Sequence, residues 1–132
     1  MTDVLAVADQ LFAGIERGDR AAIEAVYDDD ISVWNTVLPE PMDKARSLAV
    51  LDWLMAPGVT RSYDIHERLV SGDRLAQRHT LRVTVPGHEV IEMPVALFLT
   101  VADGLITHID EYVDAKASDR LVEIVPRPER RS

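Results

Sequence analysis

The sequence predicts an α+β fold in which helices precede a long, largely antiparallel sheet. The first observation is the helical spacing of apolar residues near the N-terminus, at Val4, Val7, Ala8, Leu11, Phe12 and Ile15. The second is the alternation of apolar and polar residues after residue 60, interrupted by hairpin turns at Ser71-Gly72-Asp73 and Ala102-Asp103-Gly104. This order favours a curved sheet with three helices of the N-terminal half over its concave face, which leaves a pocket between them.

Each expected helix has a cap residue in front of it. The helices are expected at about residues 4–17, 20–27 and 44–55, capped by Thr2 or Asp3, by Asp19 and by Asp43. Gly18 ends the first helix. Asp28-Asp29-Asp30 is interpreted as a polar break before a short strand at residues 31–35. The long strands are predicted at about 61–70, 74–85, 91–102 and 105–114, and residues 118–125 add a helical turn or a further strand.

Composition restricts the class of protein. With 132 residues the chain is long enough for one domain, predicted at 1–125 with a tail at 126–132. The net charge of −9 argues against nucleic acid or an anionic membrane as the partner. The absence of cysteine excludes disulfides and thiolate metal sites. We expect a cytoplasmic protein that uses no cofactor and no metal.

Two titratable residues fall on the apolar faces of predicted strands. His79 shares its face with Leu75, Gln77, Leu81 and Val83, and Glu111 shares its face with apolar residues of the last strand. An imidazole and a carboxylate in one apolar pocket are the components of acid–base catalysis. The alternatives are a core histidine bonded to the backbone and a glutamate that turns outward or pairs for structure alone.

Other residues are expected in the substrate pocket or on the outside of the sheet. Asn35 and Gln77 are candidates for hydrogen bonds to substrate, although Asn35 could equally form a turn. The expected pocket wall also includes Leu11, Trp34 and Phe98, and Tyr63 could reach it. His66 is expected at the surface, on the same face as Arg68. An outer face that serves a homodimer is expected to include Ile106, Tyr112, Met93 and Val95.

The element order, Gly18-Asp19 between the first helices and the segment Asp103-Gly104-Leu105-Ile106-Thr107 resemble the nuclear-transport-factor-2-like superfamily and its SnoaL-like branch. The resemblance covers residues 3–115 and implies a cone-shaped mixed sheet around a small-molecule pocket. Asn35 and Glu111 match the asparagine and the final aspartate of limonene epoxide hydrolases. His79 matches a catalytic histidine of scytalone dehydratase. In ketosteroid isomerases the position of Asn35 holds the catalytic aspartate, so that machinery is changed here.

These observations predict a cofactor-independent dehydratase, isomerase or cyclase for a small polyketide-, terpenoid- or steroid-like molecule. In that hypothesis His79 moves the proton, and Glu111 orients His79 or carries a second proton. The alternatives are an epoxide hydrolase or epoxide-opening cyclase, with Glu111 activating water, and a module that binds a small ligand without catalysis.

Overall fold

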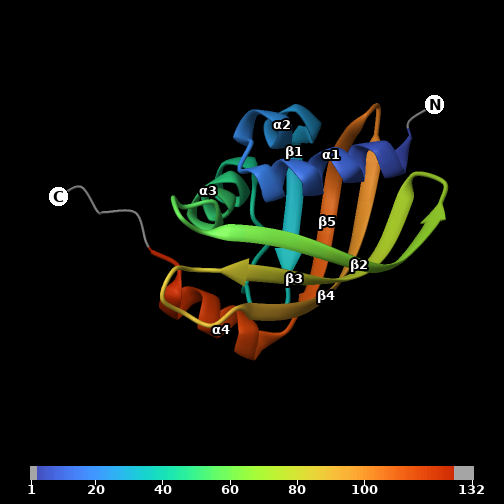
Figure 1. Cartoon of the computed structure of the whole chain (residues 1–132). Helices are drawn as coiled ribbons and strands as arrows, with labels where there is room; N and C mark the ends of the chain where they lie inside the picture. Colours follow the sequence, from blue (N-terminus) through green and yellow to red (C-terminus); the bar gives the residue numbers. More distant parts are fainter. Residues whose placement is uncertain (1–2, 127–132) are drawn as a thin grey trace.

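The computed structural model describes residues 3–126, in which helices pack against one curved five-stranded sheet (Figure 1). The predicted α+β class is therefore confirmed. The predicted tail at 126–132 lies outside the described residues except for Pro126, and Thr2, the alternative first cap, also lies outside them.

Every helix begins at an aspartate whose side chain accepts a hydrogen bond from a backbone N–H three residues later. The helices are α1 (Val4–Arg17), α2 (Arg20–Val26), α3 (Lys44–Leu54) and α4 (Ala115–Ile124), and their caps are Asp3, Asp19, Asp43 and Asp114. At the end of α1, Gly18 adopts a left-handed φ of 69°, which a side chain would strain. The three predicted helices and their caps are confirmed.

The sheet has the strand order β1-β5-β4-β3-β2. Its strands are β1 (Tyr27–Asn35), β2 (Thr60–Ser71), β3 (Arg74–Thr84), β4 (Ile91–Ala102) and β5 (Leu105–Val113). β1 pairs with β5 in parallel, and the remaining neighbours are antiparallel. The predicted bounds of the four long strands agree with the structure to within one residue at each end.

Two elements differ from the sequence prediction. Asp28-Asp29-Asp30 is not a break, because β1 already begins at Tyr27 and the three aspartates occupy an irregular stretch of its pairing with β5. The segment predicted as a helical turn or strand is the helix α4, which begins earlier, at Ala115. Trp53 of α3 donates its indole N–H to the carbonyl of Val125 at 3.3 Å, so α3 and the end of α4 meet at one end of the sheet (Figure 1).

The core lies between the sheet and the helices. α1 contributes one apolar face to it, and every second residue of β3 and β4 is buried against it. Arg61 of β2 ties the carbonyl end of α1 to the sheet, because its guanidinium donates to the carbonyl of Ile15 at 2.7 Å. None of the helices in the described residues has the length and apolar character needed to cross a membrane.

Candidate functional site

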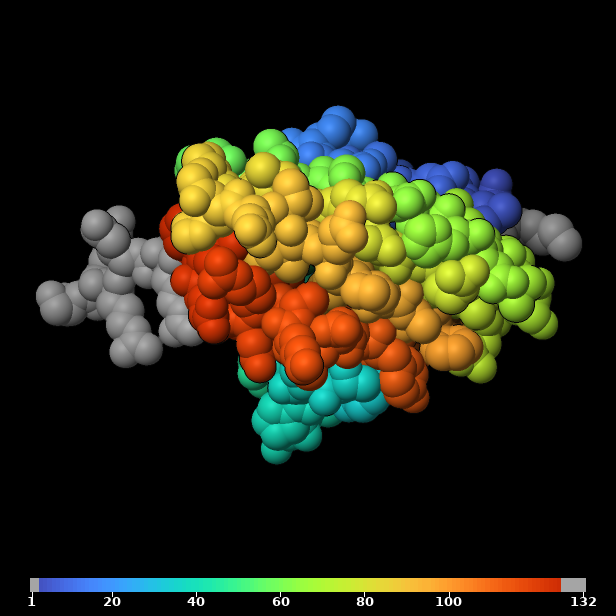
Figure 2. Space-filling view, turned by 60° about the horizontal axis from the view of Figure 1, so that its bottom comes forward, coloured from blue at the N-terminus to red at the C-terminus, as the bar shows by residue number. Residues whose placement is uncertain are grey.

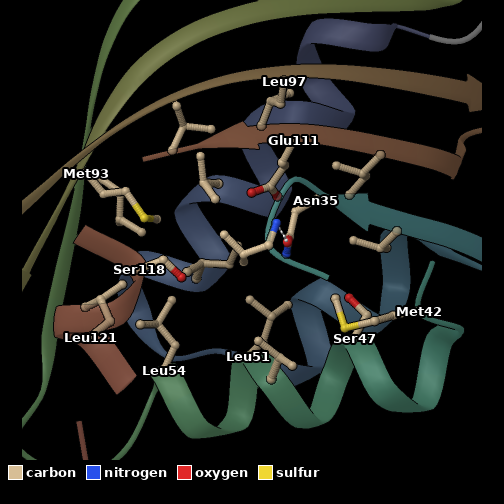
Figure 3. Close-up of a pocket in the computed structure, with 18 of the residues that line it drawn as sticks. Asn35, Met42, Ser47, Leu51, Leu54, Met93, Leu97, Glu111, Ser118 and Leu121 are labelled. Carbon is tan, nitrogen blue, oxygen red and sulfur yellow. Dashed lines mark hydrogen bonds between the residues drawn. The ribbon is translucent and has the colours of Figure 1, made fainter. Parts of the chain in front are cut away.

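A cavity of about 160 Å³ lies between the sheet and helices α1, α3 and α4. Its wall is mainly apolar, and Figure 3 shows aliphatic side chains from α3, α4 and the sheet facing one another across it. The polar residues of the wall are Tyr27, Asn35, Ser47, Tyr63, His79, Glu111 and Ser118. An apolar cavity with a few converging polar groups is the usual form of a small-molecule site.

The cavity reaches the surface between the segment after β1, α3 and α4. Val37, Val50 and Val122 line it and are 43%, 42% and 43% exposed. These three valines form an apolar rim, where contact with a largely apolar molecule is favourable because it removes apolar surface from water.

Glu111 is a carboxylate inside this apolar space. On β5 it is the register partner of Asn35 on one side and Leu97 on the other, and Figure 3 shows its carboxylate directed into the cavity. Burial raises the pKa of Glu111 from 4.5 to about 7, and no cation or hydrogen-bond donor of residues 3–126 offsets that effect. The side chain keeps partial exposure because it opens onto the cavity. At neutral pH it can therefore both accept and release a proton.

The two ends of the Asn35 side-chain amide have different roles. Its Oδ1 accepts from the backbone N–H of Val37 at 3.0 Å, which turns the chain after β1. Its Nδ2 group remains a donor at the cavity wall, beside Glu111. The two alternatives considered for Asn35, turn former and pocket residue, are thus both realised in the geometry.

His79 is buried on β3, with 3% of its surface exposed. The rings of Phe12 and Tyr63 flank it, with centroids 5.7 Å and 5.1 Å away. Gln77 Nε2 contacts His79 Nδ1 at 2.8 Å. Burial lowers the pKa of His79 from 6.5 to about 4, and His66 and the Arg68 cation lower it further in the same direction. The imidazole is therefore neutral at neutral pH.

Gln77 lies behind His79 and does not line the cavity. Its Oε1 accepts from Arg68 Nε at 2.8 Å, and Arg68 Nη1 donates to Asp9 Oδ1 of α1 at 2.6 Å. The alternation along β2 predicts Arg68 outside with His66, and that prediction is wrong. A register shift between Ile65 and Glu67 turns the strand over, so that Arg68 faces inward opposite Gln77. His66 is at the surface, as expected.

Trp34 and Phe98 are not in the cavity wall. Their neighbours Val33 and Leu97 line the cavity, so alternation directs both rings to the outer face of the sheet. There each ring contacts Tyr112, with centroid distances of 5.3 Å and 6.4 Å, and Phe98 is 43% exposed. The expected pocket role of these two residues is corrected accordingly, whereas Leu11 and Tyr63 do line the cavity.

The outer face also differs in composition from the prediction. Met93, Val95 and Ile106 are buried on the inner side, so of the four residues assigned to the outer face only Tyr112 lies there. Figure 2 views this side of the molecule, where β3, β4 and β5 (yellow to red-orange) lie side by side and the surface is hollowed beside α4. The hollow is lined by residues that include Thr80, Pro94, Ala96 and Tyr112.

Three polar residues of the cavity were missed by sequence reasoning, namely Tyr27, Ser47 and Ser118. Tyr27 Oη lies 3.3 Å from Ser47 Oγ, and burial raises the pKa of Tyr27 to about 12. Burial, with the charge of Glu111 next, also raises the pKa of Tyr63 well above its ordinary value. Both phenols therefore stay protonated and can donate hydrogen bonds. If the first strand is taken to begin at Tyr27, alternation places Tyr27 on the same face as Val33 and Asn35, which line the cavity.

Residues 3–126 contain no cluster of three or more histidine, aspartate or glutamate side chains that could hold a metal ion. The polar groups of the cavity are instead one carboxylate, one neutral imidazole, two phenols, two hydroxyls and an amide. These groups can transfer a proton and stabilise a charged oxygen.

Comparisons with known proteins agree with this architecture. The chain is 18% identical to an LEH-like epoxide hydrolase of Mycobacterium tuberculosis, with a TM-score of 0.75 over 89% of this chain and 86% of the other. It is 17% identical to IdmH, a proposed polyketide cyclase of Streptomyces antibioticus, with a TM-score of 0.74 over 92% and 99%. It is 18% identical to PrhC of Penicillium brasilianum, with a TM-score of 0.79 over 91% of this chain and 85% of the other.

Such identities establish the fold alone. An NTF2-like protein of Burkholderia xenovorans, 22% identical with a TM-score of 0.70 over 93% and 95% of the chains, carries the same fold. Among curated protein sequences, none matches this chain. The sequence profile of the SnoaL-like domain, however, matches residues 8–109. This span includes most of α1, all of α2 and α3, and the sheet up to Ile109 of β5. The chain therefore belongs to the SnoaL-like domain family of the nuclear-transport-factor-2-like fold.

Proposed function

We propose that this protein is a cofactor-independent acid–base enzyme that isomerises, dehydrates or cyclises a small, largely apolar molecule bearing an oxygen group. The observation that carries the proposal is Glu111, a carboxylate in an apolar cavity whose pKa lies at about 7. A proton carrier works best when its pKa is near the working pH. Maintaining such a group in the core is costly, and structural needs alone do not account for it.

The role of His79 differs from the sequence hypothesis. With a pKa of about 4 it is a poor base at neutral pH, and its Nδ1 is occupied by Gln77. The neutral ring is suited to donate a hydrogen bond from Nε2, as a neutral electrophile does. Glu111 is thus the proton carrier, and His79 stabilises the substrate oxygen.

In the proposed step, the Glu111 carboxylate removes a proton from the carbon next to a carbonyl. The electron pair of that C–H bond moves into the new C=C bond, and the carbonyl electrons move to oxygen, giving an enolate. Hydrogen bonds from His79, and from Tyr63 where it reaches the oxygen, stabilise this charge. Protonated Glu111 then returns the proton to another carbon or to a departing hydroxyl, so that no external oxidant or reductant is needed.

The cavity restricts the size of the substrate. At about 160 Å³ it is close to the roughly 150 Å³ cavity that accommodates benzene in an engineered protein core. One ring with short substituents fits, and a four-ring steroid requires the site to open. Among the substrate classes predicted from sequence, a compact terpenoid or a small polyketide fragment is favoured.

The test uses compact cyclic β,γ-unsaturated ketones and β-hydroxy ketones in D₂O, followed by NMR. We expect turnover with deuterium incorporation by the natural protein and a loss of at least ~10²-fold in Glu111→Gln. Tight binding of the probes without turnover or exchange would instead support the non-catalytic binding module.

A second candidate is epoxide opening, favoured by the register pairing of Asn35 with Glu111 on adjacent strands. There the Glu111 carboxylate takes a proton from a water molecule that Asn35 helps to orient, and the water oxygen bonds to an epoxide carbon as the C–O bond breaks. His79 donates a hydrogen bond to the epoxide oxygen, and protonated Glu111 then returns the proton to the resulting alkoxide. A small cyclic epoxide in H₂¹⁸O distinguishes the two candidates: one labelled oxygen in a diol product supports hydrolysis, and unlabelled product supports isomerisation.

The outer face of the sheet is proposed to form a homodimer. Leu69, Phe98 and Tyr112 are exposed apolar residues, at 63%, 43% and 52%. Sedimentation equilibrium of the natural protein and of Phe98→Lys tests this proposal. A monomeric natural protein would exclude it.

A further inference from the structure

Gln77 connects a partly buried cation, Arg68, to the imidazole of the proposed site. Arg68 Nε and Gln77 Oε1 are 2.8 Å apart, and Gln77 Nε2 and His79 Nδ1 are also 2.8 Å apart. Gln77 and His79 are each 3% exposed, so water does not compete for these bonds.

The direction of both hydrogen bonds follows from the chemistry of arginine. A guanidinium has donors only, so the amide atom that faces Arg68 is the carbonyl oxygen. The other end of the amide, which faces His79, is then the NH₂ group, and NH₂ can only donate. His79 Nδ1 is therefore the acceptor, and the proton of the neutral ring is on Nε2.

We propose that Arg68 and Gln77 are positioning residues that hold His79 as its Nε2–H tautomer, so that the ring presents a donor to the cavity. This deepens the proposed function, on which the catalytic use of that donor rests. A proton on Nδ1 would face the NH₂ group of Gln77. Rotation of the amide would relieve that contact only by directing NH₂ at Arg68.

Arg68 is itself held in place by both sides of the fold. Asp9 of α1 accepts from Nη1 at 2.6 Å, and the register shift in β2 directs the side chain inward. Its Nη2 is buried without a partner among the described residues, so one donor of the guanidinium is left unsatisfied. The cation thus disfavours a second positive charge on His79 by electrostatics as well as by hydrogen-bond polarity.

The other described groups around His79 do not favour either tautomer, because none of them forms a hydrogen bond with a ring nitrogen. Phe12 of α1 and Val95 of β4 are apolar, and Tyr63 of β2 contacts the ring edge to face. The titratable and charged neighbours are His66 and Arg68 of β2, Tyr63, and Glu111, which shares the cavity. Among them only the Arg68–Gln77 pair reaches a ring nitrogen through a hydrogen bond.

The test is the ring ¹⁵N spectrum of histidine-labelled protein, in which Nδ1 and Nε2 show different shifts when they carry a proton. His79 is assigned by the resonance that disappears in His79→Gln. We expect an unprotonated Nδ1 and a protonated Nε2 from pH 6 to 8. A protonated Nδ1 in the natural protein would overturn the proposal.

Gln77→Glu is the decisive variant because it is nearly isosteric and has acceptors only. It can still accept from Arg68, but it now requires a proton on Nδ1. We expect the ring proton to appear on Nδ1 and the pKa of His79 to rise toward its ordinary 6.5. An unchanged tautomer in a folded Gln77→Glu protein would also overturn the proposal.

Gln10→Glu is the matched control, since Gln10 is the other glutamine of the chain and lies on the exposed side of α1. It changes the net charge equally and should leave the His79 spectrum unchanged. These spectra require no turnover. If Glu111→Gln retained activity, the proposed function would fail, whereas the tautomer assignment would stand or fall on the spectra alone.

Discussion

Glu111 and Gln77 lie on one transverse row of the sheet, separated by Leu97, the register partner of both. The row continues to Asn35 beyond Glu111 and to Arg68 beyond Gln77. Leu97 is 2% exposed and places apolar atoms between the carboxylate and the guanidinium side of the row. The carboxylate therefore keeps the raised pKa that burial alone produces. Along this row, Glu111, the proposed proton carrier, is separated from Gln77, which holds the proposed donor His79.

Activity should depend on the ionisation of Glu111. Because its pKa is about 7, the rate of a step that needs the carboxylate should rise with pH and level off above that value. The measurement is kcat/KM between pH 5 and 9. Glu92→Gln, on the exposed outer side of β4, is the control and should retain the natural profile. A profile that shows no rise between pH 5 and 8 would contradict the assignment.

Stability should fall as Glu111 ionises. Its pKa in the folded state is raised from 4.5 to about 7, so its contribution is fully present below 4.5 and is lost as pH rises through 7. Glu111→Gln should therefore increase the free energy of unfolding at pH 8 by about 1–3 kcal/mol relative to the natural protein. At pH 4 the difference should be small. Urea unfolding at both pH values measures it.

His79 should act on stability in the opposite direction. Its folded-state pKa is lowered from 6.5 to about 4, so its contribution is present above 6.5 and is lost as pH falls through 4. In the natural protein the two slopes oppose each other between 4.5 and 6.5. His79→Gln should leave stability declining steadily from pH 4.5 to 7. The thermal midpoint across this range tests the prediction, and an unaltered profile would count against a neutral, buried His79.

Turnover should also fall in His79→Phe, by ~10²-fold or more, because phenylalanine keeps an aromatic ring at this position but has no N–H donor. The midpoint of the pH–rate profile should stay near 7, since it belongs to Glu111. Loss of that midpoint together with the rate would show that His79 is the titrating group, as first predicted from the sequence.

The size of the cavity should decide which molecules bind. Leu11 of α1 lines the cavity and is 2% exposed, so Leu11→Ala should enlarge it and cost about 2–5 kcal/mol of stability. Leu75→Ala is the control, because Leu75 is 1% exposed but does not line the cavity. Calorimetry with one-ring and two-ring ketones should show improved binding of the larger probe only in Leu11→Ala.

Much of the fold could be predicted from local chemistry. Aspartate caps, Gly18 and the two hairpin turns act within a few residues, so helices α1–α3 and strands β2–β5 were predicted nearly to the residue. The same alternation placed His79 and Glu111 on the inner face. The same alternation of side chains along a strand also predicts that Trp34 and Phe98 lie on the outer face.

The sequence by itself determined that a histidine and a carboxylate enter an apolar interior, because the side-chain period of a strand is two. Only the tertiary structure decided what each can do. The register shift at Ile65–Glu67 reverses the faces of β2 and brings Arg68 behind Gln77. Packing around Glu111 raises its pKa, whereas packing and Arg68 lower that of His79. Both effects depend on neighbours far away in the chain, and no local pattern encodes them.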